Sequence, residues 1–556
     1  MVLTKRQQHP MAGVPHHAAQ NYIARLIAKG HKVALCEQMG KEAIKGLMPR
    51  EVVRVFTAGT VIEPGMLDAG RNNYLVGVVL DGVEAGVAYA DISTGACSTT
   101  FLPSRRALTE ELARLAPAEL VMMEGETAVF PTVPAVSRLP NWRFEIGNAR
   151  QTLLRHFGVS DLTPFGCEGK PLPTRAAGGV LAYLQETQKG AVQQIQRLST
   201  YSTAGYMALD VATRRNLELT ESIGGERKNS LLGVLNKTVT PMGARLLRER
   251  ITRPLLDVDR LNGRYDRLQI FYDNALLRAE LRDLLKGLPD LERLTNRALS
   301  GRATPRDLDQ IGQSLAELPN FKQLIGGHAV LSALQNGLDP CDETAALIQR
   351  AISENAAPNL NKMGVIRPGF SAELDGVMNS SAHARDWVAN LEPRERARTG
   401  IGSRNIGFNK VVGYYIEVTR THSDAVPDDY IRKQTLTNAE RYIPPELKEY
   451  ETLILNAEER ILQIERRVFA EVMQRVGTAS KRLLGTAAAL AQLDVAASLA
   501  QVAATQNLVR PQLTEGSELC VENGRHPVVE QSLLDGDGGA INGRFAPNNV
   551  NLTEQQ

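Results

Sequence analysis

The sequence is poor in cysteine, and its few cysteines lie far apart. No two of the five are closer than about sixty residues, which excludes a metal site of the CxxC type and gives no disulfide framework. We therefore expect free, reduced and mostly buried thiols, as is usual in a cytoplasm. The five residues are Cys36, Cys97, Cys167, Cys341 and Cys520.

Long apolar runs are also absent. No uninterrupted run reaches 18 apolar residues, the length at which a membrane-spanning helix is expected. The first 20 residues contain His9, Pro10, Pro15 and His16 but no apolar stretch, which argues against a secretory signal peptide. We therefore predict no membrane association.

Aromatic rings and net charge are scarce as well. Aromatic residues make up 5% of the chain, and the formal net charge is +2. A chain this close to neutrality is not a uniformly basic nucleic-acid coat, so any contact with nucleic acid must come from a local patch. What the chain does have is length and ordinary apolar content: 556 residues, 43% of them hydrophobic, predict about three to five domains.

The first 65 residues or so predict a compact α/β piece. Apolar residues at helical spacing over 16–31 predict a helix, and "KVALCEQM" and "EVVRVFTAGT" predict two short strands after it. No earlier element is predicted to complete their sheet.

A second α/β domain is predicted from about residue 74 to about residue 200. "YLVGVVLDG" and "EAGVAYADISTGACSTTF" predict a hairpin or meander, "RRALTEELARLAPAE" a helix and "LVMM" an apolar strand. This order predicts a partly antiparallel sheet. The segment "CEGKPLPTRAAGG" is predicted to be a loop that leads into a helix over 180–188.

From about residue 206 the pattern becomes helical, with apolar residues every three or four positions. The longest helix is predicted over 446–476, which is about 45 Å at the helical rise per residue. A partner helix is predicted before it, beginning near Leu374. Charged flanks beside so long an apolar stripe favour a lever or a coiled pair.

A β-rich tip is predicted between these two long helices. "IGFNKVVGYYIEVTRTH", residues 406–422, predicts a strand pair with a bend at Gly413. Residues 394–442 carry nine Arg or Lys against six Asp or Glu, with tyrosines between them. Such a tip can grip nucleic-acid phosphates without reading base sequence. The alternative is a solvated, charged hairpin without a ligand.

The last stretch predicts the opening of a further domain. "CVENGRHPVVEQ" and "INGRFAPNNVNLTEQQ" have the composition of strands and turns. Within it, Arg525 and His526 are expected to shape a turn rather than to carry chemistry.

Six stretches, in the same order and over nearly the whole chain, resemble bacterial MutS proteins of DNA mismatch repair. They are "HPMAGVPHHAAQNYIARLIAKGHKVALCEQM", "ATRRNLELTES", "TVTPMGARLLRERITRPLLD", "GFNKVVGYYIEVTRTH", "RKQTLTNAERYIPPELKEYE" and "ENGRHPVVEQ". Their order makes the resemblance specific, and it favours the nucleic-acid interpretation of the tip.

The resemblance implies a multidomain α+β fold with the following plan. Residues 1–67 are part of a mixed α/β mismatch-recognition domain, 68–205 an RNase H-like connector, 206–385 and 446–505 a large helical core with long lever helices, 386–445 a β-rich clamp inserted between the levers, and 506–556 the start of an ABC-type ATPase domain.

The same resemblance implies binding of mismatched double-stranded DNA in a bacterial cytoplasm, at the nucleoid. It implies a homodimeric clamp switched by ATP with Mg²⁺, a DNA-dependent ATPase activity in the full-length family, and a MutL-type partner. The expected DNA contacts are Lys5, Arg6, Lys410, Arg432, Lys433, Asn438 and Arg441. Phe545 takes the place of an adenine-stacking aromatic with Asn548 nearby, although Phe545 also fits an ordinary residue at a strand end.

Two motifs of the family do not occur in the 556 residues. A mismatch-reading Phe-x-Glu after Gly-Asp is expected before "LTKR", and the Walker A loop G-x-x-x-x-G-K-[ST] is expected after "VNLTEQQ". We therefore expect a fragment that does not hydrolyse ATP alone and that discriminates poorly between mismatched and paired DNA. A shortened relative that acts as a DNA clamp or scaffold without reading mismatches is the alternative.

Two weaker hypotheses concern other chemistry. Asp81 and Asp91 in an RNase H-like domain would belong to a two-metal nuclease, which needs three or four converging carboxylates. His16 and His17 would be metal ligands with Cys36 as the one softer partner nearby; surface or capping histidines are the alternative. We favour neither hypothesis, and we predict no catalytic residue and no metal site.

Overall fold

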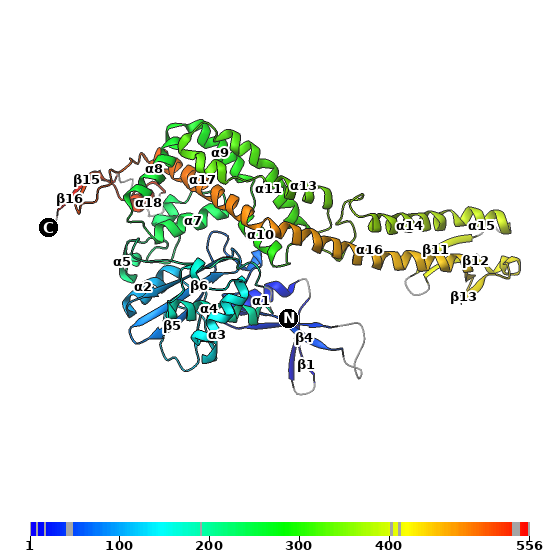
Figure 1. Cartoon of the computed structure of the whole chain (residues 1–556). Coiled ribbons are helices and arrows are strands. Elements are labelled where there is room, and N and C mark those ends of the chain that lie inside the picture. The colour runs from blue at the N-terminus through cyan, green and yellow to red at the C-terminus, as the bar shows by residue number, and fades with distance from the viewer. Residues whose placement is uncertain are drawn as a thin grey trace. The chain divides into compact units, whose positions relative to one another are not determined.

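The structure, a computed structural model, describes residues 2–6, 9–15, 18–39, 48–189, 192–400, 404–409, 413–535 and 545–553. The chain forms two compact units, which are described separately below (Figure 1). Helices and several separate sheets occur together, which agrees in general terms with the predicted α+β fold. Unit 1 comprises Met1–Arg302, Ser314–Cys341 and Ala479–Gln556, and unit 2 comprises Ala303–Gln313 and Asp342–Thr478.

Unit 1 begins with two separate two-stranded antiparallel sheets. β1 (Val2–Arg6) pairs with β2 (His9–Gly13); after helix α1 (Ala19–Ala28), β3 (Val33–Gln38) pairs with β4 (Arg50–Phe56). The predicted helix and strands are confirmed. A hairpin precedes them, but it forms a sheet of its own and does not complete theirs. The first hairpin has no apolar alternation and contains a proline, which two edge strands tolerate, so the pattern did not reveal it.

A six-stranded sheet forms the second part of unit 1, with the order β10-β7-β6-β5-β8-β9. The pairs β5–β6 and β6–β7 are antiparallel, whereas β8, β9 and β10 are added in parallel, so the predicted mixture of directions is confirmed. The strands are β5 (Leu75–Asp81), β6 (Glu84–Asp91), β7 (Ala96–Leu102), β8 (Glu119–Met123), β9 (Val136–Leu139) and β10 (Ser199–Thr200).

Three helices accompany this sheet: α2 (Arg105–Leu115), α3 (Ile146–Phe157) and α4 (Pro171–Thr187). The loop predicted before residue 180 was wrong, because α4 already begins at Pro171. Proline is favourable at the first helical position, where no amide hydrogen is needed. The glycines of this segment have low helix propensity and therefore suggested a loop. A Cβ at Gly178 would lie 2.5 Å from Ala149 of α3, so close packing of the two helices requires glycine there.

The rest of unit 1 is a helical region packed around α17 (Ser480–Gln506), which contacts α7, α8, α9, α10 and α12. Among the described residues, α17 is the one helix long and apolar enough to cross a membrane, and 72% of its most apolar stretch is buried, as expected of a core helix. The neighbouring helices are α5 (Val211–Asn216), α6 (Leu231–Leu235), α7 (Pro241–Thr252), α8 (Val258–Asp273), α9 (Ala275–Lys286), α10 (Leu291–Leu299) and α12 (Ser332–Gly337); α11 (Pro305–Leu324) is shared by both units.

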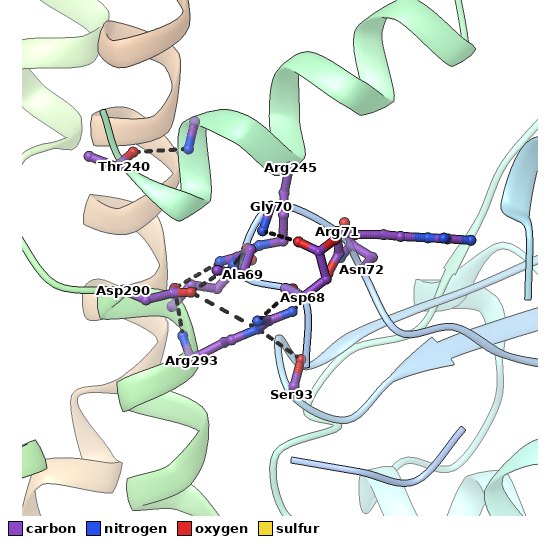
Figure 2. A network of polar contacts seen from close by, with 12 residues as sticks. Asp68, Ala69, Gly70, Arg71, Asn72, Ser93, Thr240, Arg245, Asp290 and Arg293 are labelled. Atoms are coloured by element: carbon purple, nitrogen blue, oxygen red, sulfur yellow. Dashed lines mark hydrogen bonds and ion pairs between the residues drawn. The ribbon is translucent and has the colours of Figure 1, made fainter. Parts of the chain in front are cut away.

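A polar network fastens this helical region to the six-stranded sheet, both within unit 1 (Figure 2). Arg293 of α10 donates to the carbonyl oxygens of Asp68 and Arg71, at 3.0 and 2.8 Å, and to the Ser93 hydroxyl at 3.2 Å. Because two of the three acceptors are backbone carbonyls, the connection depends mainly on the path of the chain there and less on side-chain identity.

Arg245 of α7 is the second arginine of the network. Its guanidinium forms a two-pronged ion pair with Asp290 at 2.7 and 2.8 Å, and it reaches Glu292 at 2.6 Å. It also donates to the carbonyl oxygen of Ala69 at 2.8 Å. The Arg245 side chain therefore joins α7 and the start of α10 to the segment that precedes β5.

Unit 2 consists mainly of long helices and a four-stranded sheet. Figure 1 shows α14 beside α16, with the sheet near their ends. The predicted long helix and its partner are confirmed, while the predicted strand pair is half of a sheet with the order β11-β12-β14-β13. The elements are α13 (Asp342–Ala351), α14 (Ala372–Ala389), α15 (Leu391–Thr399), β11 (Arg404–Asn409), β12 (Gly413–Thr419), β13 (Ile431–Thr435), β14 (Ala439–Ile443) and α16 (Pro445–Thr478).

The last elements of unit 1 are β15 (Leu519–Gly524), α18 (Pro527–Asp535) and β16 (Asn548–Leu552), with β15 and β16 antiparallel. The prediction of strands and turns was wrong for "PVVEQ", which is helical. His526 accepts the Val529 amide at 3.3 Å at the start of this helix, and Arg525 donates to the carbonyl of Gln506 at 2.6 Å. Both side chains thus hold the local chain path.

Candidate nucleic-acid interface

The clamp sheet, which we define as β11 to β14, packs one face against the helices of unit 2. Along β12, Ile416 and Val418 are buried, while Tyr415 and Glu417 are partly exposed, as the two-residue period of a strand requires. The buried pair belongs to a hydrophobic cluster that fixes which side chains the opposite face presents. Other buried members are Ala384, Val388, Leu391, Tyr430, Tyr442, Ile443, Leu447 and Ile454.

Aromatic stacking aligns the two helices that carry the sheet. The ring of Trp387 on α14 stacks on Tyr450 of α16, with 3.9 Å between ring centroids and 16° between their planes. Nearby, Arg385 pairs with Glu458 at 2.8 Å across the same helices. Stacked rings contribute a large contact area with few rotatable bonds, so this contact keeps the two helices in register.

Tyr415 organises the exposed face of the clamp sheet. A Cβ at Gly407 of β11 would lie 2.6 Å from its ring, so only glycine fits beneath it. The Arg441 guanidinium lies 4.1 Å from the ring centroid and pairs with Glu417 at 3.0 Å. Arg441 also donates to the amide oxygen of Gln434 at 2.9 Å. Arg441 is thus fixed within the sheet by three neighbours.

β13 is an edge strand, and all five of its residues are exposed. The pairing with β14 shifts between Arg432 and Gln434, so Lys433 is the extra residue of a β-bulge. A bulge bends its strand and re-aims the side chains around it. Within the described part of the chain the Lys433 side chain has no ion-pair or hydrogen-bond partner, and Arg432, 62% exposed, has only Glu440 at 3.3 Å.

Glu440 supplies the negative charge beside β13. The Tyr442 hydroxyl donates a hydrogen bond to Glu440. Burial and this bond raise the pKa of Tyr442 to about 12, and the same bond lowers the pKa of Glu440 below its ordinary value. Glu440 is therefore ionised at neutral pH and balances part of the charge of Arg432, but nothing described balances Lys433.

The base of the loop between β11 and β12 is anchored to α16. Gly413 has φ +84, and a Cβ there would lie 1.7 Å from a carboxylate oxygen of Glu451. That carboxylate accepts the Tyr414 amide at 3.1 Å. Glycine is therefore required both by the left-handed backbone and by the close approach of the helix.

Several other arginines of the tip are already engaged inside it. Arg398 pairs with Glu395 and Asp429 at 3.1 Å each. Arg396 pairs with Glu392 at 2.7 Å. Arg396 and Arg398 are therefore neutralised by carboxylates, whereas Lys433 of β13 has no carboxylate partner in the described part of the chain.

The structure separates the predicted DNA contacts into three groups. Arg432, Lys433 and Asn438 are exposed on β13 and the turn after it, and Arg441 is partly exposed on the neighbouring strand. Lys410 lies outside the described residues. Lys5 and Arg6 lie in β1, opposite Pro10 and His9, but their side chains lie outside the described part of the structure. The bulge at Lys433 was not predicted, because no residue in "IRKQT" marks it.

The geometry contradicts a nuclease site built from Asp81 and Asp91. Asp81 pairs with Glu84 at one end of the β5–β6 hairpin, whereas Asp91 pairs with Ala96 beyond its other end. Asp91 is also saturated: it accepts from Asn73 N–H and Ser93 N–H at 2.9 Å each. No cluster of three or more metal-ligating side chains occurs among the described residues. His16 and His17 fall outside them, and Cys36 is exposed.

The two nucleotide-site candidates lie at the last strand. Phe545 is partly buried, and Asn548 is exposed at the start of β16. They would offer a ring and an amide, but no glycine-rich loop with a lysine follows in the 556 residues. A ring and an amide can contact an adenine base, but these two residues by themselves supply no ligand for a phosphate or for Mg²⁺.

Taken together, the folds of the two units define a class: multidomain proteins whose α/β domains accompany a long two-helix arm ending in a small basic sheet. Sequence profiles of three domains match this chain in order: MutS domain I over residues 1–64, MutS domain II over 73–196 and MutS domain III over 212–500. The chain therefore belongs to the MutS family, and the resemblance noted in the sequence is confirmed.

Curated proteins named DNA mismatch repair protein MutS are similar over nearly all of this chain. The protein of Dehalococcoides mccartyi (strain ATCC BAA-2266 / KCTC 15142 / 195) is 40% identical over 566 residues, covering 100% of this chain and 65% of that protein. Those of Symbiobacterium thermophilum and Pelotomaculum thermopropionicum are each 42% identical, covering 97% and 98% of this chain and 63% and 64% of their own lengths. The chain thus spans a little under two thirds of these relatives.

Proposed function

We propose that this chain binds double-stranded DNA through its clamp sheet and takes part in DNA mismatch repair. The observation that carries the proposal is the exposed edge strand β13, where Arg432 and Lys433 face solvent at a bulge on a two-helix arm. The names of the similar proteins support a role in DNA mismatch repair. The exposed basic side chains of β13 support contact with DNA phosphates.

The mode of contact is electrostatic and positional. Lys433 would pair with a phosphate as a compact point charge, while the Arg432 guanidinium would take two phosphate oxygens. Asn438 would add a neutral hydrogen bond from the turn that follows. Such contacts set the position of a duplex but carry no base sequence.

Family membership is the sole support for the remaining proposals. We propose mismatched duplex DNA as the physiological ligand, ATP with Mg²⁺ as cofactors of the complete ATPase site, a homodimer, a MutL-type partner and a place in the bacterial cytoplasm at the nucleoid. Phe545 and Asn548 are proposed as the first residues of that nucleotide site.

The test is equilibrium binding of a fluorescent duplex at several salt concentrations. The double variant Arg432→Glu/Lys433→Glu should bind at least about tenfold more weakly, and the slope of log affinity against log salt should flatten by about 1 to 2 units. The matched control is Arg106→Glu/Lys286→Glu, which changes net charge equally at two exposed, unrelated helices of unit 1. Equal affinity of the clamp variant and wild type at low salt would refute the clamp as the DNA contact.

A further inference from the structure

Three arginines gather around one cavity in the helical region of unit 1. Arg250 on α7 and Arg264 and Arg267 on α8 line a cavity of about 170 Å³. Most of the remaining wall is apolar and comes from α7, α8 and α17: Leu247, Leu261, Leu268, Ala496 and Leu499. The cavity is large enough for a group of several oxygens, and its apolar wall provides no counter-charge.

These arginines lack the acidic partners that arginines of comparable burial have elsewhere in the unit. In the described part of the chain the side chains of Arg250 and Arg264 form no hydrogen bond or ion pair, and Nε of Arg250 is buried without an acceptor. Arg267 donates to the neutral amide oxygen of Gln492 at 3.1 Å. By contrast, the buried Arg245 has two carboxylates.

Burial without a directly paired carboxylate lowers the pKa values of two of these arginines. Burial, then the charges of Arg264 and Arg267, lower the pKa of Arg250 to about 10. Burial, then the charge of Arg260, likewise lowers the pKa of Arg264. The charge of Glu249 opposes both shifts, but in the described part of the chain it forms no ion pair with Arg250 or Arg264. Partly buried cations without a directly paired anion are costly. An oxyanion in the cavity would remove that cost and would accept several guanidinium hydrogens at once.

A larger apolar cavity lies next to the arginines. Its volume is about 490 Å³, and it shares Leu235, Tyr265, Leu268 and Leu499 with the first cavity. Tyr272 and Val509 complete much of its apolar lining, and Val509 is 88% exposed. The two cavities together therefore match a ligand with an anionic head and an apolar or aromatic body.

We propose that Arg250, Arg264 and Arg267 bind the phosphate group of a small organic phosphate whose apolar or aromatic part occupies the neighbouring cavity. Three guanidinium groups offer more donors than one carboxylate accepts well, and a tetrahedral dianion uses them better. Duplex DNA does not fit this description, because its phosphates lie on a hydrated rod and the cavity is small and walled by leucines.

The test uses phenyl phosphate as a minimal probe with a head and a body, inorganic phosphate as the head alone, and phenol as the body alone. Titration calorimetry of the whole chain should show that phenyl phosphate binds at least about tenfold more tightly than inorganic phosphate at equal ionic strength. Arg250→Leu and Arg264→Gln should each weaken phenyl phosphate by about tenfold or more, and neither should change the response to phenol.

Controls separate binding from folding and from the clamp. Arg264→Lys keeps the charge but loses the fork, so it should bind with intermediate affinity, and circular dichroism reports whether each variant is folded. Arg106→Gln removes an exposed arginine elsewhere and should bind like wild type, as should the clamp variant Arg432→Glu/Lys433→Glu. The proposal is overturned if wild type shows no saturable binding of phenyl phosphate up to about 10 mM, or if folded Arg250→Leu and Arg264→Gln bind it unchanged.

Discussion

At the residue scale, Arg245 shows how much a single buried side chain can hold in place. Its side chain is 3% exposed and pairs with Asp290 and Glu292, while it also donates to the backbone at Ala69. A buried ion pair adds little net stability when it is intact, but removal of one partner leaves a charge without compensation.

We therefore predict that Arg245→Met destabilises the chain by about 3–5 kcal/mol, because Asp290 would remain buried without its partner. Urea unfolding followed by circular dichroism measures this loss. The matched control Arg106→Met removes an exposed i,i+4 pair with Glu110 and should leave the free energy of unfolding almost unchanged. A similar small loss for both variants would show that the network does not bear on stability.

The same site predicts a pH effect. Burial alone would raise the pKa of Asp290, but hydrogen bonds and charge from Arg245, with Arg293, outweigh it and leave that pKa below its ordinary value. A carboxylate with a lowered folded pKa contributes stability above its unfolded pKa of about 4, and this contribution is lost as the pH falls below that value. The free energy of unfolding should therefore fall as the pH is lowered from 7 to 3, and it should fall less for Arg245→Met than for wild type. An equal fall in both proteins would contradict the assignment.

The sequence could indicate which residues at the clamp are basic but not how each is engaged. Arg432 and Lys433 are adjacent in "IRKQT", and only the register with β14 reveals that one of them is the extra residue of a bulge. Arg441 was predicted as a phosphate contact on the same grounds, yet Glu417 and Tyr415 come from another strand to hold it. Such partners are set by strand pairing, which residue type alone does not determine.

At the element scale, the start of α7 is fastened to α17 by one buried carboxylate. Asp494 of α17 accepts the Thr240 amide at 2.8 Å and the Thr240 hydroxyl at 2.6 Å, and Thr240 also caps the helix through the Gly243 amide at 3.0 Å. A Cβ at Gly243 would lie 2.3 Å from the Asp494 carboxylate. The glycine is therefore required by the proximity of the second helix.

This contact predicts opposite effects of the same substitution on two helices. Gly243→Ala should destabilise by about 1–3 kcal/mol, because the methyl group would displace the carboxylate. Gly263→Ala in α8 meets nothing within 4 Å and should stabilise by up to about 1 kcal/mol, since alanine is the better helix former. Thermal unfolding of both variants measures this, and a stabilising Gly243→Ala would refute the close approach.

Long elements with a clear period were predictable, and elements defined by tertiary contacts were not. The apolar stripe of α16 predicted a helix from Glu446 to Val476, close to the observed Pro445–Thr478. The first hairpin was not predicted, because it contains Pro10, which an edge strand tolerates. The beginning of α4 was not predicted, because its glycines suggested a loop, whereas Gly178 is needed for close packing against α3. The local sequence shows the spacing of apolar residues in an element, but it does not show which other element will pack against it.

At the scale of the whole molecule, domain identity was accessible from the order of six short stretches, and three domain profiles confirm the family. The finer domain boundaries stay predictions, as do the RNase H-like character of the six-stranded sheet and the ATPase assignment of the last residues.

Phosphate contacts at the clamp predict no dependence on base pairing. The Arg432→Glu/Lys433→Glu variant should lose affinity for a G·T duplex and for its fully paired control by the same factor, within about 1 kcal/mol, because both duplexes present the same backbone. Parallel anisotropy titrations with the two duplexes decide this. A loss confined to the G·T duplex would mean that β13 reads the mispair.

The edge position of β13 has a consequence for how the chain behaves in a concentrated solution. An unpaired strand edge is a template for pairing with the same strand of another molecule, and bulges and lysines are common obstacles to that pairing. Lys433 supplies both obstacles at one position of the clamp sheet. A sequence that kept the sheet but replaced Arg432 and Lys433 with β-branched apolar residues would therefore tend to join sheets edge to edge. The same two side chains would thus oppose self-association and attract phosphates.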